Sequence, residues 1–378
     1  MKVCIIAKAL ELHRRGGFET HVTQLAECLA RLGNDVHVVC RRLPRISRAK
    51  YSFVLHDVKF VRTGIEIIDN YTSVFPFARC LKSLFEKNDF DIVHGHGISS
   101  VAYPLSVRLG GKKMPFVYTL HGIASRHLVG YKQPYRAVLK LMFDMERFSV
   151  KRADKLICVS KSTIDDAVKY YSIARDKCVY IPNGADVKRF MLKRKKRKPR
   201  TVGFVGFLHE RKGVQCLVEG FAGVVKCYPD ARLVIIGRGP MLEKLKMQAE
   251  NLGIQKNLAF LSHVSDKELV QCYSEMDILA LPSLYEGFGI VAVEALASGM
   301  PVIVTDAGDL AAIAKSAGIV INPGARQVEA AILRLFSDSR LYSRLKSNAR
   351  KRAAEFDWMN IARKTEKLYN EVLQRQDF

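Results

Sequence analysis

The sequence of residues 285–304 is YEGFGIVAVEALASGMPVIV, and the order of residue types in this stretch indicates the fold. A glycine-containing turn is followed by an apolar segment that predicts a helix beginning near Ile290, and the β-branched run 301–305 predicts a strand. A turn, a helix and a buried strand in succession are typical of a parallel α/β sheet. Two carboxylates, Glu286 and Glu294, interrupt this stretch, although Leu or Ala would avoid the cost of desolvating them.

The same alternation extends along the chain in both directions. One series of β-branched runs precedes residue 190 and a second follows it, with amphipathic segments between the runs. The predicted strands are residues 2–7, 35–40, 91–96, 115–122, 155–160 and 178–184, then 200–207, 231–237, 257–263, 277–283, 301–305 and 318–322. We therefore expect an α/β fold of two doubly wound, Rossmann-like domains with a cleft between them.

The length of 378 residues also favours two domains, because a single hydrophobic core stops growing below this size. The run KRKKRKPR cannot bury an apolar face and is expected to be an exposed linker. The predicted organisation is an N-terminal domain (1–192), this linker (193–200), a C-terminal domain (201–355) and a closing helix (356–378) that packs back on the N-terminal domain.

Nine cysteines are scattered singly through apolar runs, with no Cys-x-x-Cys pair. This pattern predicts reduced thiols, hence a cytoplasmic protein, and no structural zinc site. Charged residues crowd the first apolar run, MKVCIIAKAL, so we interpret it as a strand and not as a signal peptide. No run of about 20 apolar residues predicts a transmembrane helix.

The net charge of +24 is distributed unevenly. Residues 1–190 hold 32 Lys and Arg against 17 Asp and Glu, whereas residues 201–378 hold 22 against 20. A cationic first half predicts an anionic partner, such as membrane phospholipid, a phosphorylated molecule or nucleic acid, unless it is only a well-solvated surface. The basic run 193–198 contains no aromatic residue on which a base could stack, so nucleic acid is not expected.

Two segments at predicted strand ends carry ligand-binding residue types. In HRRGGFETH (13–21), a Gly-Gly pair either forms a plain tight turn or lets the backbone approach a phosphate. It lacks the Gly-x-Gly-x-x-Gly pattern of dinucleotide-binding enzymes. In FVGFLHERKGV (204–214), Arg211 and Lys212 either are one more exposed basic pair or bind a diphosphate.

The two carboxylates of the opening stretch suit hydroxyl groups. The N–H groups of the helix that begins near Ile290 would point at an anion, and Glu294 lies about one turn into that helix. A carboxylate accepts two hydroxyl hydrogen bonds at once, as a vicinal diol such as ribose requires. The alternative is a pair of acids placed near a helix N-terminus by the macrodipole, although the apolar neighbours of Glu294 argue against it.

Together these segments resemble the retaining glycosyltransferases of family 4, which have the GT-B fold. The resemblance spans nearly the whole chain and rests on five segments in order, GGFETHV, TLHG, IPNGAD, GFLHERKG and EGFGIVAVEALASGMPVI. The last matches the family's Glu-x7-Glu motif and is the most specific. Lys212 follows Arg211 directly, whereas many relatives space the two cations by several residues.

The resemblance implies a role for each matching position. Arg211 and Lys212 would neutralise the donor diphosphate, Glu286 would bind hydroxyls of the transferred sugar, Glu294 would hold the nucleotide ribose, and His121 would lie across the cleft near the reacting sugar. The implied catalytic residues are Glu286, His121, Arg211 and Lys212, and the implied donor-binding residues are Gly17, Arg211, Lys212, Phe288, Gly289, Ile290 and Glu294.

The implied activity is metal-independent, retaining hexosyl transfer without a cofactor. The donor is a UDP- or GDP-sugar, and the acceptor is a hydroxyl of a lipid-linked, polysaccharide or other glycan. His94 and His96 are candidates for the acceptor side, with core packing as the alternative. The cationic first domain predicts peripheral docking on an anionic membrane at its cytoplasmic face, through RRLPRISRAKY (41–51).

Three other enzyme or binding functions are compatible with this fold. They are a sugar-nucleotide epimerase, a glycogen-synthase-like enzyme and a non-catalytic nucleotide-sugar sensor. Product analysis separates the epimerase, because it needs no acceptor. The presence of Glu286, Glu294, Arg211 and Lys212 argues against the sensor.

Overall fold

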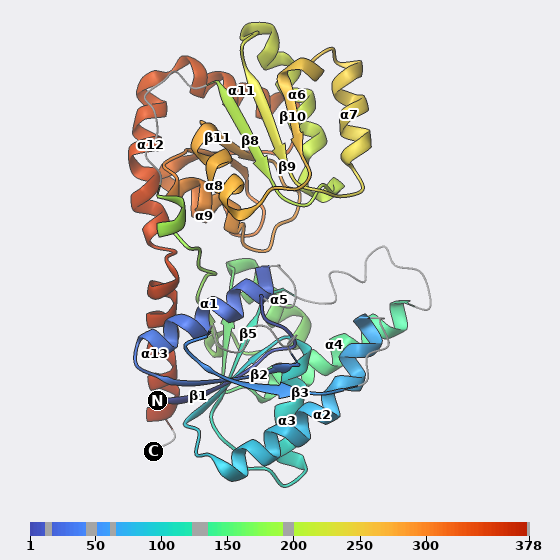
Figure 1. Ribbon diagram of the computed structural model, residues 1–378, viewed down its shortest axis with the longest axis vertical. Helices are drawn as coiled ribbons and strands as arrows, with labels where there is room; N and C mark the ends of the chain where they lie inside the picture. Colours follow the sequence, from blue (N-terminus) through green and yellow to red (C-terminus); the bar gives the residue numbers. More distant parts are fainter. Residues whose placement is uncertain (12–16, 43–50, 61–65, 123–134, 192–199, 376–378) are drawn as a thin grey trace. The chain divides into compact units, whose positions relative to one another are not determined.

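The computed structural model describes residues 1–11, 17–42, 51–60, 66–122, 135–191 and 200–375. The chain forms two compact units, of which the first comprises Met1–Asn183 and Trp358–Phe378 and the second Gly184–Asp357. Each unit is a parallel sheet flanked by helices (Figure 1), so the predicted α/β fold of two Rossmann-like domains is confirmed. None of the described helices is long and apolar enough to cross a membrane.

In the first unit the described strands form a sheet with the order β3-β2-β1-β4-β5-β6-β7. They are β1 (Lys2–Ile6), β2 (Asp35–Arg41), β3 (Val54–Val58), β4 (Ile92–His96), β5 (Phe116–Leu120), β6 (Lys155–Cys158) and β7 (Cys178–Tyr180). All six pairings are parallel, as the buried, β-branched runs predicted. The sequence did not predict β3, because His56 and Asp57 interrupt its apolar pattern and Val54 is 47% exposed at the sheet edge.

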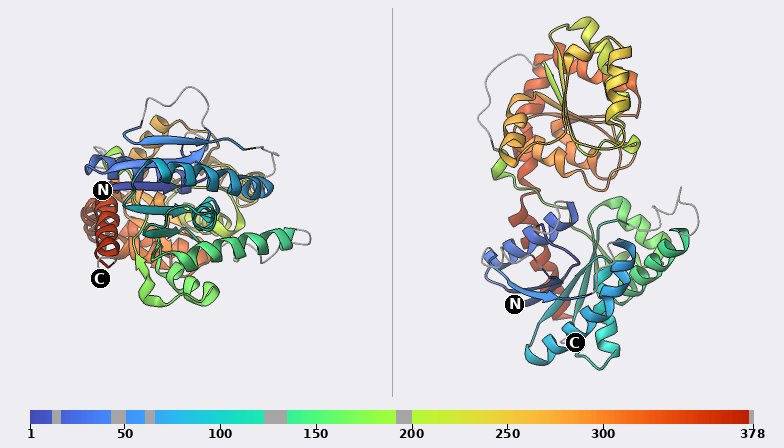
Figure 2. Two further views of the ribbon diagram at one scale, coloured as in Figure 1. Left: turned by 90° about the horizontal axis from the view of Figure 1, so that it is seen from below. Right: turned by 45° about the vertical axis from the view of Figure 1, so that its right-hand side comes forward.

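Helices cover both faces of this sheet (Figure 2). They are α1 (Gly17–Arg31), α2 (Glu66–Lys87), α3 (Ala102–Arg108), α4 (Tyr135–Arg152), α5 (Lys161–Tyr171) and α13 (Trp358–Gln374), with short 3-10 turns η2 (Ile98–Val101) and η4 (Arg175–Lys177). Successive strand residues point to opposite faces. Val3 and Ile5 pack with α1 and α13, whereas Cys4 and Ile6 pack with α2 to α5.

The closing helix α13 is fastened to the first sheet by a buried polar contact as well as by its apolar face. Nδ1 of His94 lies 2.6 Å from the hydroxyl of Tyr369, and Nε2 lies 2.7 Å from Oγ1 of Thr119. All three residues are fully or almost fully buried. Burial lowers the pKa of His94 to about 3, so its imidazole is neutral and uses one nitrogen as donor and the other as acceptor. This contact is core packing, the alternative that the sequence left open for His94.

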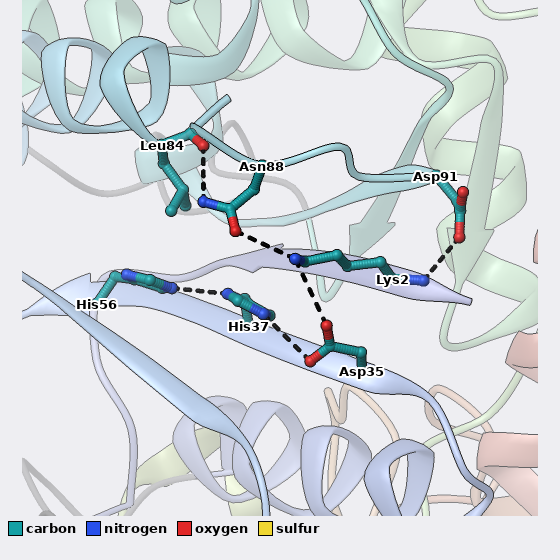
Figure 3. A network of polar contacts seen from close by, with 7 residues as sticks. All are labelled: Lys2, Asp35, His37, His56, Leu84, Asn88 and Asp91. Atoms are coloured by element: carbon teal, nitrogen blue, oxygen red, sulfur yellow. Dashed lines mark hydrogen bonds and ion pairs between the residues drawn. The ribbon is translucent and has the colours of Figure 1, made fainter. Parts of the chain in front are cut away.

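A polar network joins the edge strand β3 to its neighbours β2 and β1 (Figure 3). Nδ1 of His37 lies 2.8 Å from Nε2 of His56, and Nε2 of His37 lies 3.1 Å from Oδ1 of Asp35. The ammonium group of Lys2 lies 3.6 Å from the same carboxylate. Burial is the largest cause of the lowered pKa of both histidines. These side chains fasten the edge strand β3, which buries few apolar residues of its own.

The second unit contains a sheet with the order β10-β9-β8-β11-β12-β13. Its strands are β8 (Thr201–Val205), β9 (Arg232–Ile236), β10 (Leu258–Leu261), β11 (Ile278–Leu281), β12 (Val302–Thr305) and β13 (Gly318–Ile321). Its helices are α6 (Val214–Cys227), α7 (Leu242–Asn251), α8 (Asp266–Glu275), α9 (Ile290–Ala297), α10 (Leu310–Ala314), α11 (Ala325–Ser337) and α12 (Ser339–Ala354), with 3-10 turns η5 (Lys188–Phe190), η6 (Glu210–Lys212), η7 (Gln255–Asn257) and η8 (Lys315–Ala317). Each strand was predicted within a few residues of its observed bounds.

The boundary between the units lies after Asn183, earlier than the boundary at residue 192 expected from the basic run. Apolar side chains that follow Asn183 explain the difference. Val187 and Phe190 are buried in the core of the second unit, where the ring of Phe190 packs edge-on against Tyr273 at 5.0 Å. Of the predicted linker, residues 193–199 lie outside the described residues, as do residues 43–50 of the predicted membrane-contact segment.

Each sheet has one point at which the strand order reverses. In the first unit the chain moves outward from β1 to β3 and then returns to β4, which lies beside β1. In the second unit the corresponding neighbours are β8 and β11. In open α/β sheets, ligands bind outside the carboxyl ends of the strands at such a reversal. The candidate site residues should therefore be sought after β1, β4, β8 and β11.

We expect Tyr369→Phe to destabilise the protein by about 1–3 kcal/mol, because it leaves one nitrogen of the buried His94 without a partner. Tyr170→Phe is the matched control, since Tyr170 is exposed on α5. Chemical unfolding followed by circular dichroism measures both variants. If both lose the same free energy of unfolding, the contact does not hold α13 in place.

Candidate functional site

The predicted residues of the second unit converge at the carboxyl ends of β8 and β11. Arg211 and Lys212 belong to the turn η6, which follows β8, and Glu286 belongs to the loop between β11 and α9. The helix α9 begins at Ile290, as the sequence predicted, and Glu294 lies within it. The reversal of strand order thus brings together side chains that are more than 70 positions apart, as the 74-residue separation of Lys212 and Glu286 shows.

A close backbone approach sets the positions of the two loops. The N–H of Leu284 donates a hydrogen bond of 2.8 Å to the carbonyl oxygen of Arg211. Gly213 adopts a left-handed conformation with φ of 67°, and a Cβ at this position would overlap with the carbonyl group of Pro282. Position 213 therefore requires glycine for two reasons, the left-handed backbone conformation and the lack of room for a Cβ atom.

Lys212 and Glu286 form an ion pair at this junction. Nζ of Lys212 lies 2.5 Å from Oε2 of Glu286, and the side chains are only 14% and 12% exposed. Oε1 of the same carboxylate accepts a hydrogen bond of 3.3 Å from the N–H of Gly287, and the hydroxyl of Ser283 lies 3.5 Å from Oε2. The carboxylate is thus held in one orientation, which is what positioning a ligand hydroxyl requires.

Arg211 is exposed beside this pair. One guanidinium nitrogen donates a hydrogen bond of 3.3 Å to the carbonyl oxygen of Tyr285, and the guanidinium carbon lies 6.0 Å from the centre of the Tyr285 ring. A guanidinium group has five N–H donors, so this contact orients the group without using all of them. Arg211 therefore has the geometry for binding an anion at the surface of the site.

The start of α9 offers backbone donors. The N–H groups of the first turn, which includes Ile290 and Val291, have no acceptor within the helix and lie at the positive end of its dipole. Gly289 precedes them with φ of 95°, and a Cβ there would overlap with Leu310. Phe288 is 3% exposed, and its ring packs against Phe356 at 5.7 Å. Its side chain therefore anchors the loop, and only its backbone is available to a ligand.

Glu294 has a different environment from Glu286. Its Oε2 accepts a hydrogen bond of 2.8 Å from the hydroxyl of Tyr273. Burial raises the pKa of Glu294, although the hydrogen bond from Tyr273 and the charge of Arg189 act in the opposite direction. Within the described part of the chain, no donor contacts its other oxygen, Oε1. Tyr273 was missed at the sequence level, because nothing in a sequence pairs it with a carboxylate 21 positions away.

In the first unit, the predicted residues follow β1 and β5, the strands on either side of β4. Gly17 begins α1, and His121 directly follows β5. Nε2 of His121 lies 3.1 Å from Nδ1 of His96, which ends β4 and is fully buried. The ring of Phe18 packs against His121 at 4.9 Å. Residues 13–16 of the predicted glycine loop lie outside the described residues.

Two further residues, His21 and Asn183, lie beside His121 and were not singled out from the sequence. His21 on α1 packs edge-on against His121, with 4.6 Å between ring centres, and Nδ1 of His21 lies 2.7 Å from Oδ1 of Asn183. Their segments, GGFETHV and IPNGAD, were both recognised, but no sequence signal pairs residues 162 positions apart.

We expect Gly213→Ala to destabilise the protein more than Gly253→Ala does. The two glycines have nearly the same conformation, with φ of 67° and 70°, but the space beside Gly253 is open. Both variants incur about 1–2 kcal/mol for a left-handed alanine, and overlap with Pro282 adds about 1–3 kcal/mol at Gly213. Chemical unfolding of both variants measures the difference. Equal losses would contradict the close approach of the two loops.

Comparison with known proteins shows two matching family models, Glycosyltransferase Family 4 over residues 15–189 and Glycosyl transferases group 1 over residues 188–352. The D-inositol 3-phosphate glycosyltransferase of Corynebacterium jeikeium is 28% identical over 94% of this chain and 92% of its own length.

Two solved structures show the same fold. Sucrose-phosphate synthase from Thermosynechococcus elongatus has a TM-score of 0.78 at 21% identity and covers 99% of both chains. Anabaena Alr3699/HepE, solved in complex with UDP and glucose, has a TM-score of 0.76 at 18% identity and covers 98% of this chain and 100% of its own. The two family models divide the chain close to the boundary between its two units. The chain therefore belongs to the group 1 glycosyltransferases of family 4 type, which have the GT-B fold.

Proposed function

We propose that the protein transfers a hexose from a nucleoside diphosphate sugar to a hydroxyl group of a lipid-linked, polysaccharide or other glycan acceptor, with retention of configuration. The observation that carries this proposal is the junction between β8 and β11, where Lys212, Arg211, Glu286 and the start of α9 lie together. UDP and GDP are the proposed nucleotides, and the likeness to a protein solved with UDP and glucose supports UDP.

The diphosphate is assigned to the cationic part of this site. Lys212 has three N–H donors, and one contact is to Glu286, so the ammonium group can bind a phosphate oxygen without leaving the carboxylate. Arg211 binds phosphate oxygens from the exposed side. The N–H groups of Phe288, Gly289 and Ile290 are the proposed backbone contacts, because a helix N-terminus attracts anions.

The two carboxylates are assigned to the two sugars of the donor. Glu286 is fixed by Lys212 and Gly287, which suits it to hold hydroxyls of the transferred hexose in one geometry. Glu294 retains Oε1 for a ribose hydroxyl while Tyr273 orients the group through Oε2. In the first unit, Gly17 and His121 are the proposed contacts to the donor phosphate and the transferred hexose.

The reaction follows from where charge develops. As the bond from the anomeric carbon to the diphosphate breaks, negative charge grows on the leaving oxygen, and Lys212, Arg211 and the α9 dipole stabilise it. The acceptor hydroxyl attacks the face that the diphosphate leaves, which gives retention. No metal ion is required for this stabilisation, so we expect turnover to be insensitive to EDTA.

The two carboxylates should respond differently to mutation. We expect Glu294→Ala to weaken nucleoside diphosphate binding about 10–100-fold, because charge-assisted hydrogen bonds are worth about 1.5–3 kcal/mol. Glu286→Ala should abolish turnover and leave that binding nearly unchanged. Calorimetric titration with UDP and GDP, together with a transfer assay, measures both effects.

Glu250→Ala is the control, since Glu250 is exposed at the end of α7. A thermal-shift screen across nucleoside diphosphates and their sugars identifies the nucleotide first, because a ligand at 100 times its Kd stabilises the native state by about 2.7 kcal/mol. The assignment of roles is wrong if the two glutamate variants lose binding and turnover to the same extent.

We also propose that the protein works on an acceptor at the cytoplasmic membrane face. Residues 1–190 carry the excess of basic residues, and each Lys or Arg near an anionic surface contributes about 1 kcal/mol of attraction. We expect the protein to sediment with vesicles of anionic phospholipid and to be released by salt. Equal sedimentation with neutral phosphatidylcholine vesicles would contradict the proposal.

A further inference from the structure

His121, the proposed contact to the transferred hexose, is held by a second histidine. His121 follows β5, and His96 ends the neighbouring strand β4. Nδ1 of His96 lies 3.1 Å from Nε2 of His121. His96 is fully buried, whereas His121 is only partly buried. The contact uses Nε2 of His121 within the protein, so Nδ1 is the nitrogen that remains for a ligand.

Aromatic neighbours fix the ring of His121. The ring of Phe18 packs against it with 4.9 Å between ring centres, and the ring of His21 packs edge-on at 4.6 Å. His21 is held in turn, because its Nδ1 lies 2.7 Å from Oδ1 of Asn183. When packing fixes the orientation of an imidazole, the position of its proton decides which nitrogen donates a hydrogen bond and which accepts one.

Both imidazoles of the pair are neutral at neutral pH. Burial is the largest cause of the lowered pKa of His96 and of His121, and nearby histidines lower both pKa values further. A neutral imidazole carries one proton, so one of the two facing nitrogens donates and the other accepts. A neutral His121 also suits glycosyl transfer, because positive charge develops on the sugar in the transition state.

The other nitrogen of His96 indicates which member of the pair donates. Nε2 of His96 is buried and has no hydrogen-bond partner in the part of the chain that the structure describes. If Nε2 carried the proton, a buried N–H would lack an acceptor, which is rarer in proteins than an acceptor that lacks a donor. The proton of His96 therefore belongs on Nδ1, from which it donates to His121. Since Nε2 of His121 accepts, the proton of His121 belongs on its own Nδ1.

We propose that His96 is a positioning residue that fixes His121 as the tautomer with its proton on Nδ1, so that His121 presents a hydrogen-bond donor to an oxygen of the transferred hexose. The contact to the hexose rests on the proposed function, whereas the tautomer is a property of the free protein. The bond made by one imidazole nitrogen sets the protonation of the other. His96 is fully buried and acts only through this bond.

The direct test is the tautomer of His121 in the ligand-free, full-length protein at neutral pH. Long-range proton–nitrogen correlation spectra of protein labelled with ¹⁵N-histidine show which ring nitrogen carries the proton. The signals that disappear in His121→Ala identify this residue. We expect the proton of His121 on Nδ1. A proton on Nε2, or rapid exchange between the two nitrogens, would overturn the proposal.

A variant of His96 tests whether this residue fixes the tautomer. His96→Phe removes both nitrogens and keeps a planar ring, so we expect the proton of His121 to leave Nδ1 for Nε2. His37→Phe is the matched control, because Nδ1 of His37 lies 2.8 Å from Nε2 of His56, the same two atoms in another pair of strands. The control should leave the spectrum of His121 unchanged. If His121 keeps its proton on Nδ1 in His96→Phe, His96 does not position it.

Circular dichroism establishes that each variant is folded. Where His96→Phe does not fold, His96→Gln replaces it, because the glutamine amide reaches the position of Nε2 and not that of Nδ1.

Calorimetric titration with UDP and UDP-glucose connects the tautomer to the sugar, since the ratio of the two Kd values isolates the contribution of the glucose. We expect His96→Phe to weaken UDP-glucose binding about 2–10-fold relative to UDP, the effect of one neutral hydrogen bond. In a His121→Ala background there is no imidazole to orient, so His96→Phe should have no further effect. The same loss in both backgrounds would show that His96 acts elsewhere.

The measurements separate this inference from the proposed function. If His121 carries its proton on Nδ1 but wild-type protein gains no affinity from the glucose, the proposed contact to the hexose is wrong and the tautomer stands. If the proton lies on Nε2, the role of His96 is wrong, and the assignment of the donor site in the second unit is untouched.

Discussion

The contact between the backbone of Gly213 and the carbonyl group of Pro282 is the constraint on which the second unit's site depends. Two loops that follow neighbouring strands can meet only if one of them lacks a side chain at that point. Because they meet, Leu284 bonds to Arg211 and Lys212 reaches Glu286. The backbone contact between the loops therefore brings the charged side chains of the site within reach of one another.

The ion pair of the second unit's site and the buried imidazoles of the first unit lie in different electrostatic environments. The second unit places ionised groups at its strand ends and pairs them, as with Lys212 and Glu286 at 2.5 Å. The first unit buries imidazoles and keeps them neutral, since desolvation lowers the pKa of His21, His94 and His96. A charged group can bind a charged ligand, whereas a neutral imidazole offers one hydrogen-bond donor and one acceptor.

The sequence predicted most of the fold, because alternation of β-branched runs and amphipathic helices is a local property. It also placed the start of α9 at Ile290, where glycines precede an apolar helix. It missed β3, whose polar residues hide the strand pattern, and it placed the domain boundary too late, because the charge of 193–200 was more conspicuous than the burial of Phe190. The partners of the site residues, such as Tyr273 for Glu294 and Asn183 for His21, depend on contacts across the fold and could not be predicted.

The second unit is one continuous segment, Gly184–Asp357, whereas the first needs both ends of the chain. On the ribosome the first sheet is therefore made long before α13, the helix that covers Val3 and Ile5. At about 5–20 residues per second, that apolar face waits roughly 10–40 s for its cover. During this interval the nascent chain exposes a surface that a chaperone or a neighbouring chain can bind, and the second unit is completed only as the interval ends.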